Sequence, residues 1–135
     1  MNFLYNELVV DCCSAYVATL CNLLEGRDSE YAIKSHIGFA LSDHVGMTCE
    51  HEPNDPGAWP ERGSVTLTLH VAYWCLLNAT SFEDGIERAI RIGGDTDTYA
   101  AVAGALLGAR FGLQGIPYEW RRNLMGREIM RTIAE

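Results

Sequence analysis

The sequence predicts an all-α fold, and three observations favour it. Apolar residues recur at helical spacing in most segments of the 135-residue chain. No segment shows a strong alternation of apolar and polar residues, which is the pattern typical of strands. Glycine or proline separates several of the periodic segments. We therefore expect residues 1–135 to form a single compact helical domain.

Composition narrows the classes of function. The chain is 48% hydrophobic and 21% charged, as expected for a folded protein, and its net charge is −8. Only Arg121 and Arg122 are adjacent basic residues, so we expect no nucleic-acid binding. The apolar stretch 9–24 contains Asp11 and Asn22 and follows no basic start, so we expect a core helix and no membrane partner.

The five cysteines show no C-x-x-C spacing: Cys12, Cys13, Cys21, Cys49 and Cys75. An odd number of cysteines, mostly inside apolar runs, indicates reduced, buried thiols and a cytoplasmic protein. A catalytic thiol is the less favoured alternative.

Two helices are expected in the first third of the chain. The first spans about 3–25 and has a second apolar stripe, so we expect it to be covered on more than one side. That stripe contains Val9, Cys13, Val17 and Leu24. Gly26 ends the helix. Asp28 or Ser29 then caps a second helix that runs to about residue 41.

Residues 42–63 are expected to form a long connector, because they contain three of the four prolines. The run Cys49-Glu50-His51-Glu52 leaves a metal-binding loop as an alternative, which is less favoured because no regular element holds a ligand pair. Long loops often contribute to binding, and Trp59 is a candidate lining residue.

The third helix is expected over residues 64–78, with a strand as the alternative for its β-branched first half. Ser81 begins a capping-box-like motif that opens a short helix. On that helix we expect Ile86, Ala89 and Ile90 to point inward. The helix leads into the pair Gly93-Gly94.

The stretch Gly93-Gly94-Asp95-Thr96-Asp97-Thr98 is the principal candidate site. Two glycines allow a tight turn with positive φ. Two carboxylates and two hydroxyls follow at the start of a helix, and Mg²⁺ or Mn²⁺ prefers such oxygen ligands. Helix capping by Asp and Thr is the alternative for these residues.

The last third of the chain begins with a buried helix over about 99–111. Gly104, Gly108 and Gly112 form a stripe that predicts close packing of another helix. Pro117 starts the final amphipathic helix, with Trp120 on its inner side. Its remaining apolar residues are Leu124, Ile129, Met130 and Ile133.

Much of this pattern resembles one known family. The segments 81–86 and 93–105, followed by Gly108, Gly112, Ile116-Pro117 and Trp120, are similar to the C-terminal signature of the ADP-ribosylglycohydrolases. Gly63, Val65 and Leu69 resemble the element before that signature, although Ser64 replaces its usual aromatic residue. Residues 8–25 are similar to a helix from the middle of the family sequence.

The resemblance implies a fold, an activity and a site. The fold would be the orthogonal all-α arrangement of the C-terminal half of the family fold. Members use Mg²⁺ or Mn²⁺ to cleave glycosidic bonds of ADP-ribose. By matching position, the metal ligands would be Asp95, Asp97 and Thr98. The residues facing ADP-ribose would be Gly63, Ser64, Val65, Gly93, Gly94 and Thr96.

The chain departs from the family pattern in length. Members are about twice as long, and their N-terminal half supplies further acidic metal ligands that this chain lacks, since it has no Asp-Asp pair. Three hypotheses follow. The chain is a hydrolase completed by a second chain, a non-catalytic module that binds ADP-ribose, a nucleotide or a protein, or a fragment of a longer protein. Whether it is an enzyme stays open. Helices built to pack on an absent half favour self-association, so we expect a homodimer.

Overall fold

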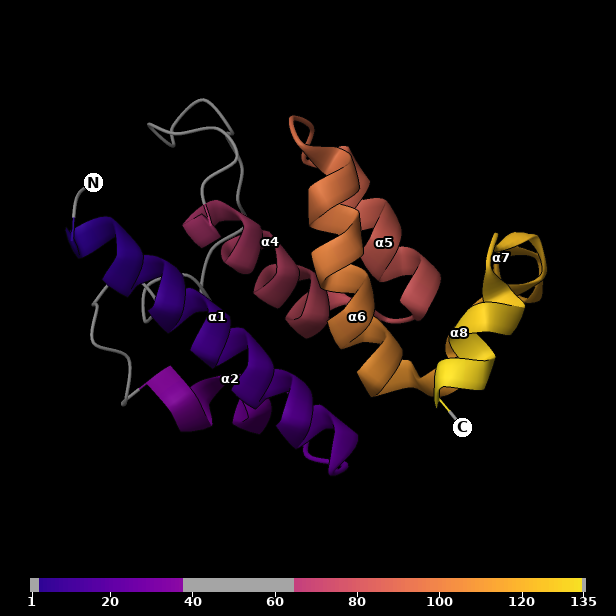
Figure 1. Ribbon diagram of the computed structural model, residues 1–135, viewed down its shortest axis with the longest axis horizontal. Helices are drawn as coiled ribbons and strands as arrows, with labels where there is room; N and C mark the ends of the chain where they lie inside the picture. Colours follow the sequence, from indigo (N-terminus) through magenta and orange to yellow (C-terminus); the bar gives the residue numbers. More distant parts are fainter. Residues whose placement is uncertain (1–2, 38–64, 135) are drawn as a thin grey trace.

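The computed structural model describes residues 3–37 and 65–134, and every regular element in these ranges is a helix (Figure 1). The elements are α1 (Phe3–Leu24), α2 (Ser29–Ile37), α4 (Val65–Asn78), α5 (Phe82–Arg91), α6 (Thr96–Gly115), α7 (Tyr118–Asn123) and α8 (Arg127–Ala134). The all-α prediction is therefore confirmed. The expectations for the connector 42–63, the Cys49–Glu52 loop, Trp59, Gly63 and Ser64 lie outside the described residues.

Helix α4 forms the centre of the core. It packs against α1, α2, α5 and α6, and both of its faces are buried. Its fully buried side chains include Leu67, Val71 and Leu76. The helix prediction for this segment is correct and the strand alternative is wrong, because packing on all sides outweighs the weak helix propensity of β-branched residues.

The cap of α5 forms as predicted. The backbone N–H of Asp84 donates to Ser81 Oγ over 3.1 Å. Phe82, Gly85 and Ala89 make the buried face, and α5 lies beside α6 (Figure 1). The inward prediction for Ile90 is wrong, since its side chain is 51% exposed. Ile90 lies one residue beyond this three-to-four-residue repeat and so falls outside the buried face.

The glycine stripe of α6 is confirmed at two of its three positions. A Cβ atom at Gly104 would lie 3.3 Å from Ile86, and one at Gly108 would lie 4.0 Å from Phe82, so both glycines face α5. Gly112 instead interrupts the helix, with φ of 71°. Nothing packs near it, so its role is conformational.

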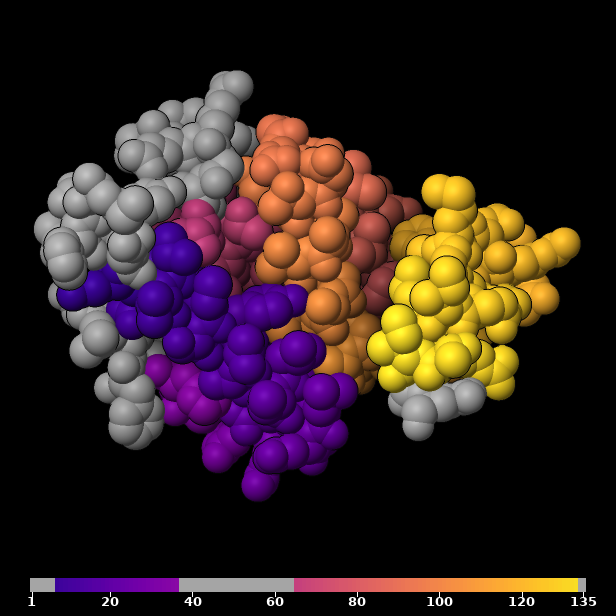
Figure 2. Space-filling model, viewed as in Figure 1, coloured from indigo at the N-terminus to yellow at the C-terminus, as the bar shows by residue number. Residues whose placement is uncertain are grey.

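The C-terminal segment differs from the single helix that the sequence predicts. It forms α7 and α8, separated by a turn in which Gly126 takes φ of 75°. The rings of Trp120 and Phe82 pack edge to face with their centroids 6.1 Å apart. The Trp120 side chain is nevertheless 41% exposed. Figure 2 shows the two helices projecting from one side of the molecule. The apolar side chains of α8 are exposed, because no described element covers that face.

Helix α1 is less covered than predicted. Its inner side packs on α2, α4 and α6, whereas Cys13, Val17 and Leu24 of the second stripe are exposed. By length and composition alone, Glu7–Leu24 meets the criterion for a membrane-spanning helix, a criterion that the core helices of globular proteins also meet.

Of the four cysteines among the described residues, two are buried and two are exposed. Cys12 and Cys75 are buried free thiols, as predicted, and burial raises their pKa values to about 11 and about 12. Cys13 and Cys21 are free and exposed, which corrects the prediction for these two positions. They lie on the outer side of α1, which no other described helix covers.

Candidate functional site

The turn between α5 and α6 positions the candidate metal ligands. Gly93 and Gly94 both take positive φ, of 80° and 78°, which confirms the predicted conformation. Asp95 occupies the N-cap position of α6, and Thr96 is its first residue. Asp95, Asp97 and Thr98 are all exposed at this end of the helix. The diglycine turn therefore presents the three side chains to solvent.

Thr98 contacts both of the other predicted ligands. Thr98 Oγ1 donates to Asp95 Oδ1 over 2.9 Å, and the backbone N–H of Thr98 donates to Asp97 Oδ1 over 3.0 Å. The pKa of Asp97 lies below its ordinary value. The largest cause is its interaction with the Asp95 carboxyl group, and the second is the hydrogen bond from the backbone N–H of Thr98. Thr98 therefore links the two carboxyl groups, through its hydroxyl to Asp95 and through its backbone N–H to Asp97.

The capping alternative accounts for only part of this geometry. Asp95 sits at the N-cap, yet its side chain accepts no backbone N–H bond. Its Oδ1 instead accepts the hydroxyl of Thr98. Asp97 does accept one backbone N–H in the first turn. The negative charges also lie at the positive end of the helix dipole, which favours them whether or not a metal binds.

The donor set fits a hard divalent cation in part. Two carboxylates and a hydroxyl are the oxygen ligands that Mg²⁺ and Mn²⁺ prefer. Within the described ranges, however, no three His, Cys, Asp or Glu side chains come together in a way that could hold a metal. The turn thus supplies an incomplete ligand set, and further ligands would have to come from water or from another chain.

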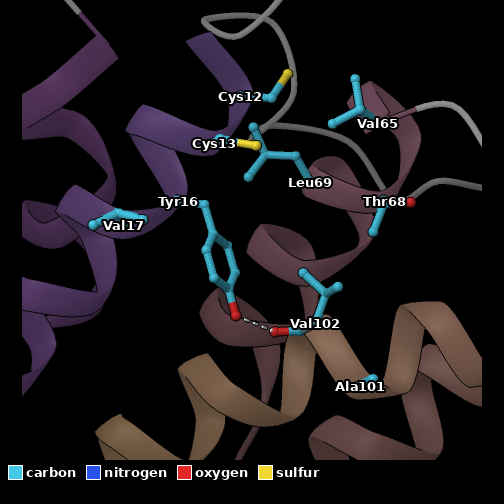
Figure 3. Close-up of a pocket in the computed structure, with 9 residues that line it drawn as sticks. All are labelled: Cys12, Cys13, Tyr16, Val17, Val65, Thr68, Leu69, Ala101 and Val102. Carbon is cyan, nitrogen blue, oxygen red and sulfur yellow. Dashed lines mark hydrogen bonds between the residues drawn. The ribbon is translucent and has the colours of Figure 1, made fainter. Parts of the chain in front are cut away.

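An apolar cavity of about 420 Å³ lies between α1, α4 and α6 (Figure 3). Nine residues line it: Cys12, Cys13, Tyr16, Val17, Val65, Thr68, Leu69, Ala101 and Val102. Across it, the Tyr16 hydroxyl donates to the carbonyl oxygen of Val102 over 2.9 Å, which ties α1 to α6. The cavity reaches α6 at Ala101, one turn after Thr98.

The predicted substrate-facing residues are distributed over two places. Gly93, Gly94 and Thr96 belong to the turn itself, and Thr96 is half-buried. Val65 begins α4 and lines the cavity. Gly63 and Ser64 lie outside the described residues. The structure therefore groups three of these residues with the metal ligands and places Val65 with the cavity.

Sequence reasoning did not anticipate the cavity. Tyr16 falls at helical spacing with the apolar residues of α1, and the spacing alone does not show that its hydroxyl has a partner on α6. That contact joins residues 86 positions apart. A polar atom at the tip of an otherwise apolar stripe was the available signal, because a buried hydroxyl requires a hydrogen-bond partner.

The family model for ADP-ribosylglycohydrolases matches residues 5–135. The chain belongs to the ADP-ribosylglycohydrolase family. This match confirms the resemblance seen in the sequence, and it includes the diglycine turn together with all three predicted ligands.

Curated relatives support the assignment to the ADP-ribosylglycohydrolases. The ADP-ribosylarginine hydrolase Tri1 of Pseudomonas putida (strain GB-1) is 30% identical over 130 residues, which cover 93% of this chain and 34% of the relative. The ADP-ribosylhydrolase ARH3 of Danio rerio is 30% identical over 132 residues, or 89% of this chain and 34% of the relative.

A solved structure shows the same fold. A chain of an ADP-ribosylglycohydrolase-related protein complex superposes with a TM-score of 0.78 and 30% sequence identity. The alignment covers 91% of the present chain and 44% of that chain. The chain therefore spans about a third of the length of the curated relatives and less than half of this structural neighbour.

Proposed function

We propose that this chain carries one metal half-site of an ADP-ribosylglycohydrolase and takes part in hydrolysis of an ADP-ribosyl glycosidic bond once a partner chain completes the site. The observation that carries the proposal is that Thr98 hydrogen-bonds to both Asp95 and Asp97 beside the diglycine turn. These are the residues that match the family signature. Since the described residues give an incomplete ligand set, the proposal requires ligands from outside them.

Each residue of the turn has a distinct task in this proposal. Asp95 and Asp97 would hold a Mg²⁺ or Mn²⁺ ion through their carboxylate oxygens, and Thr98 would offer its hydroxyl oxygen. Held there, such an ion would supply the chemistry of orienting ribose hydroxyls and water and of stabilising charge at the reacting carbon. Gly93 and Gly94 lack side chains, so the ribose can approach the backbone closely.

The relatives suggest the class of substrate. Tri1 is named as an ADP-ribosylarginine hydrolase and ARH3 as an ADP-ribosylhydrolase. ADP-ribosylated proteins are thus the proposed substrates and ADP-ribose the proposed product. Gly63, Ser64, Val65 and Thr96 are proposed to contact the ADP-ribosyl group. The completing chain is proposed to be a second copy or a separate partner, in the cytoplasm, where the four free thiols of the described residues would stay reduced.

The experiment measures ADP-ribose release from an ADP-ribosylarginine-modified protein at millimolar Mg²⁺ or Mn²⁺. The chain is assayed by itself over a range of concentrations, and then with an extract of its source cells. The double variant D95N/D97N is the matched negative control. E83Q is the control for removing a surface carboxylate elsewhere, because Glu83 is an exposed carboxylate outside the turn.

Release that depends on metal, and that disappears in D95N/D97N but not in E83Q, supports the proposal. Release that is equal in the wild type and D95N/D97N contradicts it. Binding of ADP-ribose without release in any mixture would replace it with the non-catalytic binding module.

A further inference from the structure

Helix α1 displays an apolar face to solvent. Val10, Val17 and Leu24 are 61%, 55% and 70% exposed, and the exposed Cys13, Ser14 and Cys21 lie between them. Apart from Ser14, these positions lie three or four residues apart, so together they form one stripe along the helix. We call these six residues the outer face of α1.

The outer face is separate from the side of α1 that packs in the core. The buried residues Cys12, Ala15, Thr19 and Leu23 lie on the opposite side, against α2, α4 and α6. On the view in Figure 2, no other described helix lies in front of α1. Cys13 and Val17 also line the apolar cavity, so a helix laid along this face would cover the mouth of the cavity as well.

Apart from Ser14, the residues of the outer face are symmetric about Val17. Val10 and Leu24 each lie seven residues from it, and Cys13 and Cys21 each lie four residues from it. Beyond the apolar residues, the acidic Glu7 on α1 and the basic Arg27, three residues past the end of α1, each lie ten residues from Val17. Such a face is complementary to itself when a second helix runs in the opposite direction, as a two-fold axis requires.

We propose that a second copy of this chain covers the outer face, with the two α1 helices antiparallel and the two-fold axis at Val17. Val10 then meets the partner's Leu24, Cys13 meets the partner's Cys21, and Val17 meets the partner's Val17. The proposal stands on this face alone and does not depend on hydrolase activity.

Charge complementarity selects the antiparallel arrangement. It places Glu7 beside the partner's Arg27 at both ends of the pair, whereas a parallel pair would place Glu7 beside the partner's Glu7. No ion pair joins Glu7 or Arg27 to another side chain in the ranges 3–37 and 65–134. Both charges are exposed. The Arg27 guanidinium also lies over the Tyr31 ring, 5.4 Å from its centroid. Like charges in contact disfavour the parallel pair, and opposite charges favour the antiparallel one.

The first test measures the oligomeric state by sedimentation. The substitution Val17→Glu places two like charges at the two-fold axis, so we expect the wild-type dimer to become a monomer. Ile133→Glu is the matched control, since it also converts an exposed apolar residue, 80% exposed, into an acid, and it should leave the dimer intact. Circular dichroism checks that both variants remain helical. A wild-type monomer at all concentrations up to millimolar would overturn the proposal.

The second test exchanges the terminal charges. Glu7→Arg and Arg27→Glu should each weaken the dimer, because each creates two pairs of like charges. The double variant E7R/R27E restores opposite charges at both ends. Its dissociation constant should therefore return to within about threefold of the wild-type value. Additive weakening in the double variant would contradict the antiparallel pairing.

The third test reads the register directly. Mild oxidation with copper phenanthroline and oxygen should join Cys13 to the partner's Cys21, because neighbouring helices bring opposing Cα atoms near the separation that a disulfide needs. Peptide mass mapping identifies the linked cysteines and separates them from any product of Cys49. Links of Cys13 to Cys13 and of Cys21 to Cys21 would show a parallel pair and overturn the proposal. Association only with a different protein, at this same face, would overturn it too.

Discussion

Thr98 Oγ1 donates a hydrogen bond to Asp95 Oδ1 over 2.9 Å, so two of the three predicted metal ligands are already in contact within the first turn of α6. The turn that makes this possible is Gly93-Gly94, where both residues take positive φ. An L-residue with a side chain rarely adopts that conformation. The glycines thus bring the oxygen atoms together, and the helix holds them there.

Removing the Thr98 hydroxyl should weaken metal binding without unfolding the helix. Thr98→Val keeps the shape of the side chain but removes its oxygen atom, and the side chain is exposed. We expect the affinity for Mn²⁺ to fall about tenfold, or ~1.4 kcal/mol. Thr98→Ser, which retains the hydroxyl, should bind as the wild type does. Calorimetric titration of the completed assembly distinguishes them, and equal affinities for all three proteins would remove Thr98 from the ligand set.

Gly85 and Gly108 should respond in opposite directions to the same substitution. A Cβ atom at Gly85 would lie 2.5 Å from Leu107 Cδ1 and 3.1 Å from Ala79 Cβ, so Gly85→Ala overpacks the contact between α5 and α6. We expect a loss of about 1–3 kcal/mol in the free energy of unfolding. At Gly108 the nearest atom is 4.0 Å away, so Gly108→Ala should gain up to about 1 kcal/mol from helix propensity. Urea denaturation measures both, and destabilisation by G108A would contradict the packing described.

The hydrogen bond from Tyr16 to Val102 should contribute measurably to stability. Tyr16→Phe removes the donor and leaves the carbonyl oxygen of Val102 without it, at the cavity between α1 and α6. We expect the free energy of unfolding to fall by about 1 kcal/mol. Tyr31→Phe is the control, because Tyr31 is half-exposed and its hydroxyl bonds no other described residue. A Tyr16→Phe protein as stable as the wild type would show that water replaces the bond.

Asp84 should make stability depend on acid pH. The backbone N–H of Thr80 and then the guanidinium of Arg88 hold the pKa of the Asp84 carboxyl below its ordinary 3.8. Since the folded pKa is depressed, the contribution to stability is present above the unfolded pKa and is lost as the pH falls through the folded pKa.

Asp84→Asn should therefore destabilise the protein at neutral pH by about 1 kcal/mol. The difference from the wild type should shrink as the pH falls below about 4. Glu87→Gln is the control, because its ion pair with Arg91 is exposed and should matter little. Denaturation at several pH values provides the measurement. A difference that stays constant down to the lowest pH would show that the Asp84 charge is not involved.

The sequence predicted best those features that depend on local chemistry. The capping bond of Ser81 and the positive φ of Gly93 and Gly94 both follow from neighbouring residues. Contacts between distant segments were missed. Gly85 gave no sign that Leu107 would occupy the space of its absent side chain, because that contact depends on how α5 meets α6.

The sequence pattern also did not predict which apolar side chains are exposed to solvent. The apolar residues of the second stripe of α1 were expected to be covered, yet Val17 and Leu24 are exposed. Periodicity shows which residues share a face, but it does not show whether a partner for that face belongs to the same chain. The same reasoning applies to Ile133 on α8.

The most direct test of the proposed site is a comparison of Mn²⁺ binding by the wild type, the D95N/D97N variant and the E83Q control, measured by electron paramagnetic resonance on the completed assembly. If the carboxylates at the diglycine turn hold the ion, the wild type and E83Q bind Mn²⁺ and D95N/D97N loses at least about tenfold in affinity, or ~1.4 kcal/mol. Equal binding by all three proteins, or binding by none at millimolar Mn²⁺, would contradict the metal half-site.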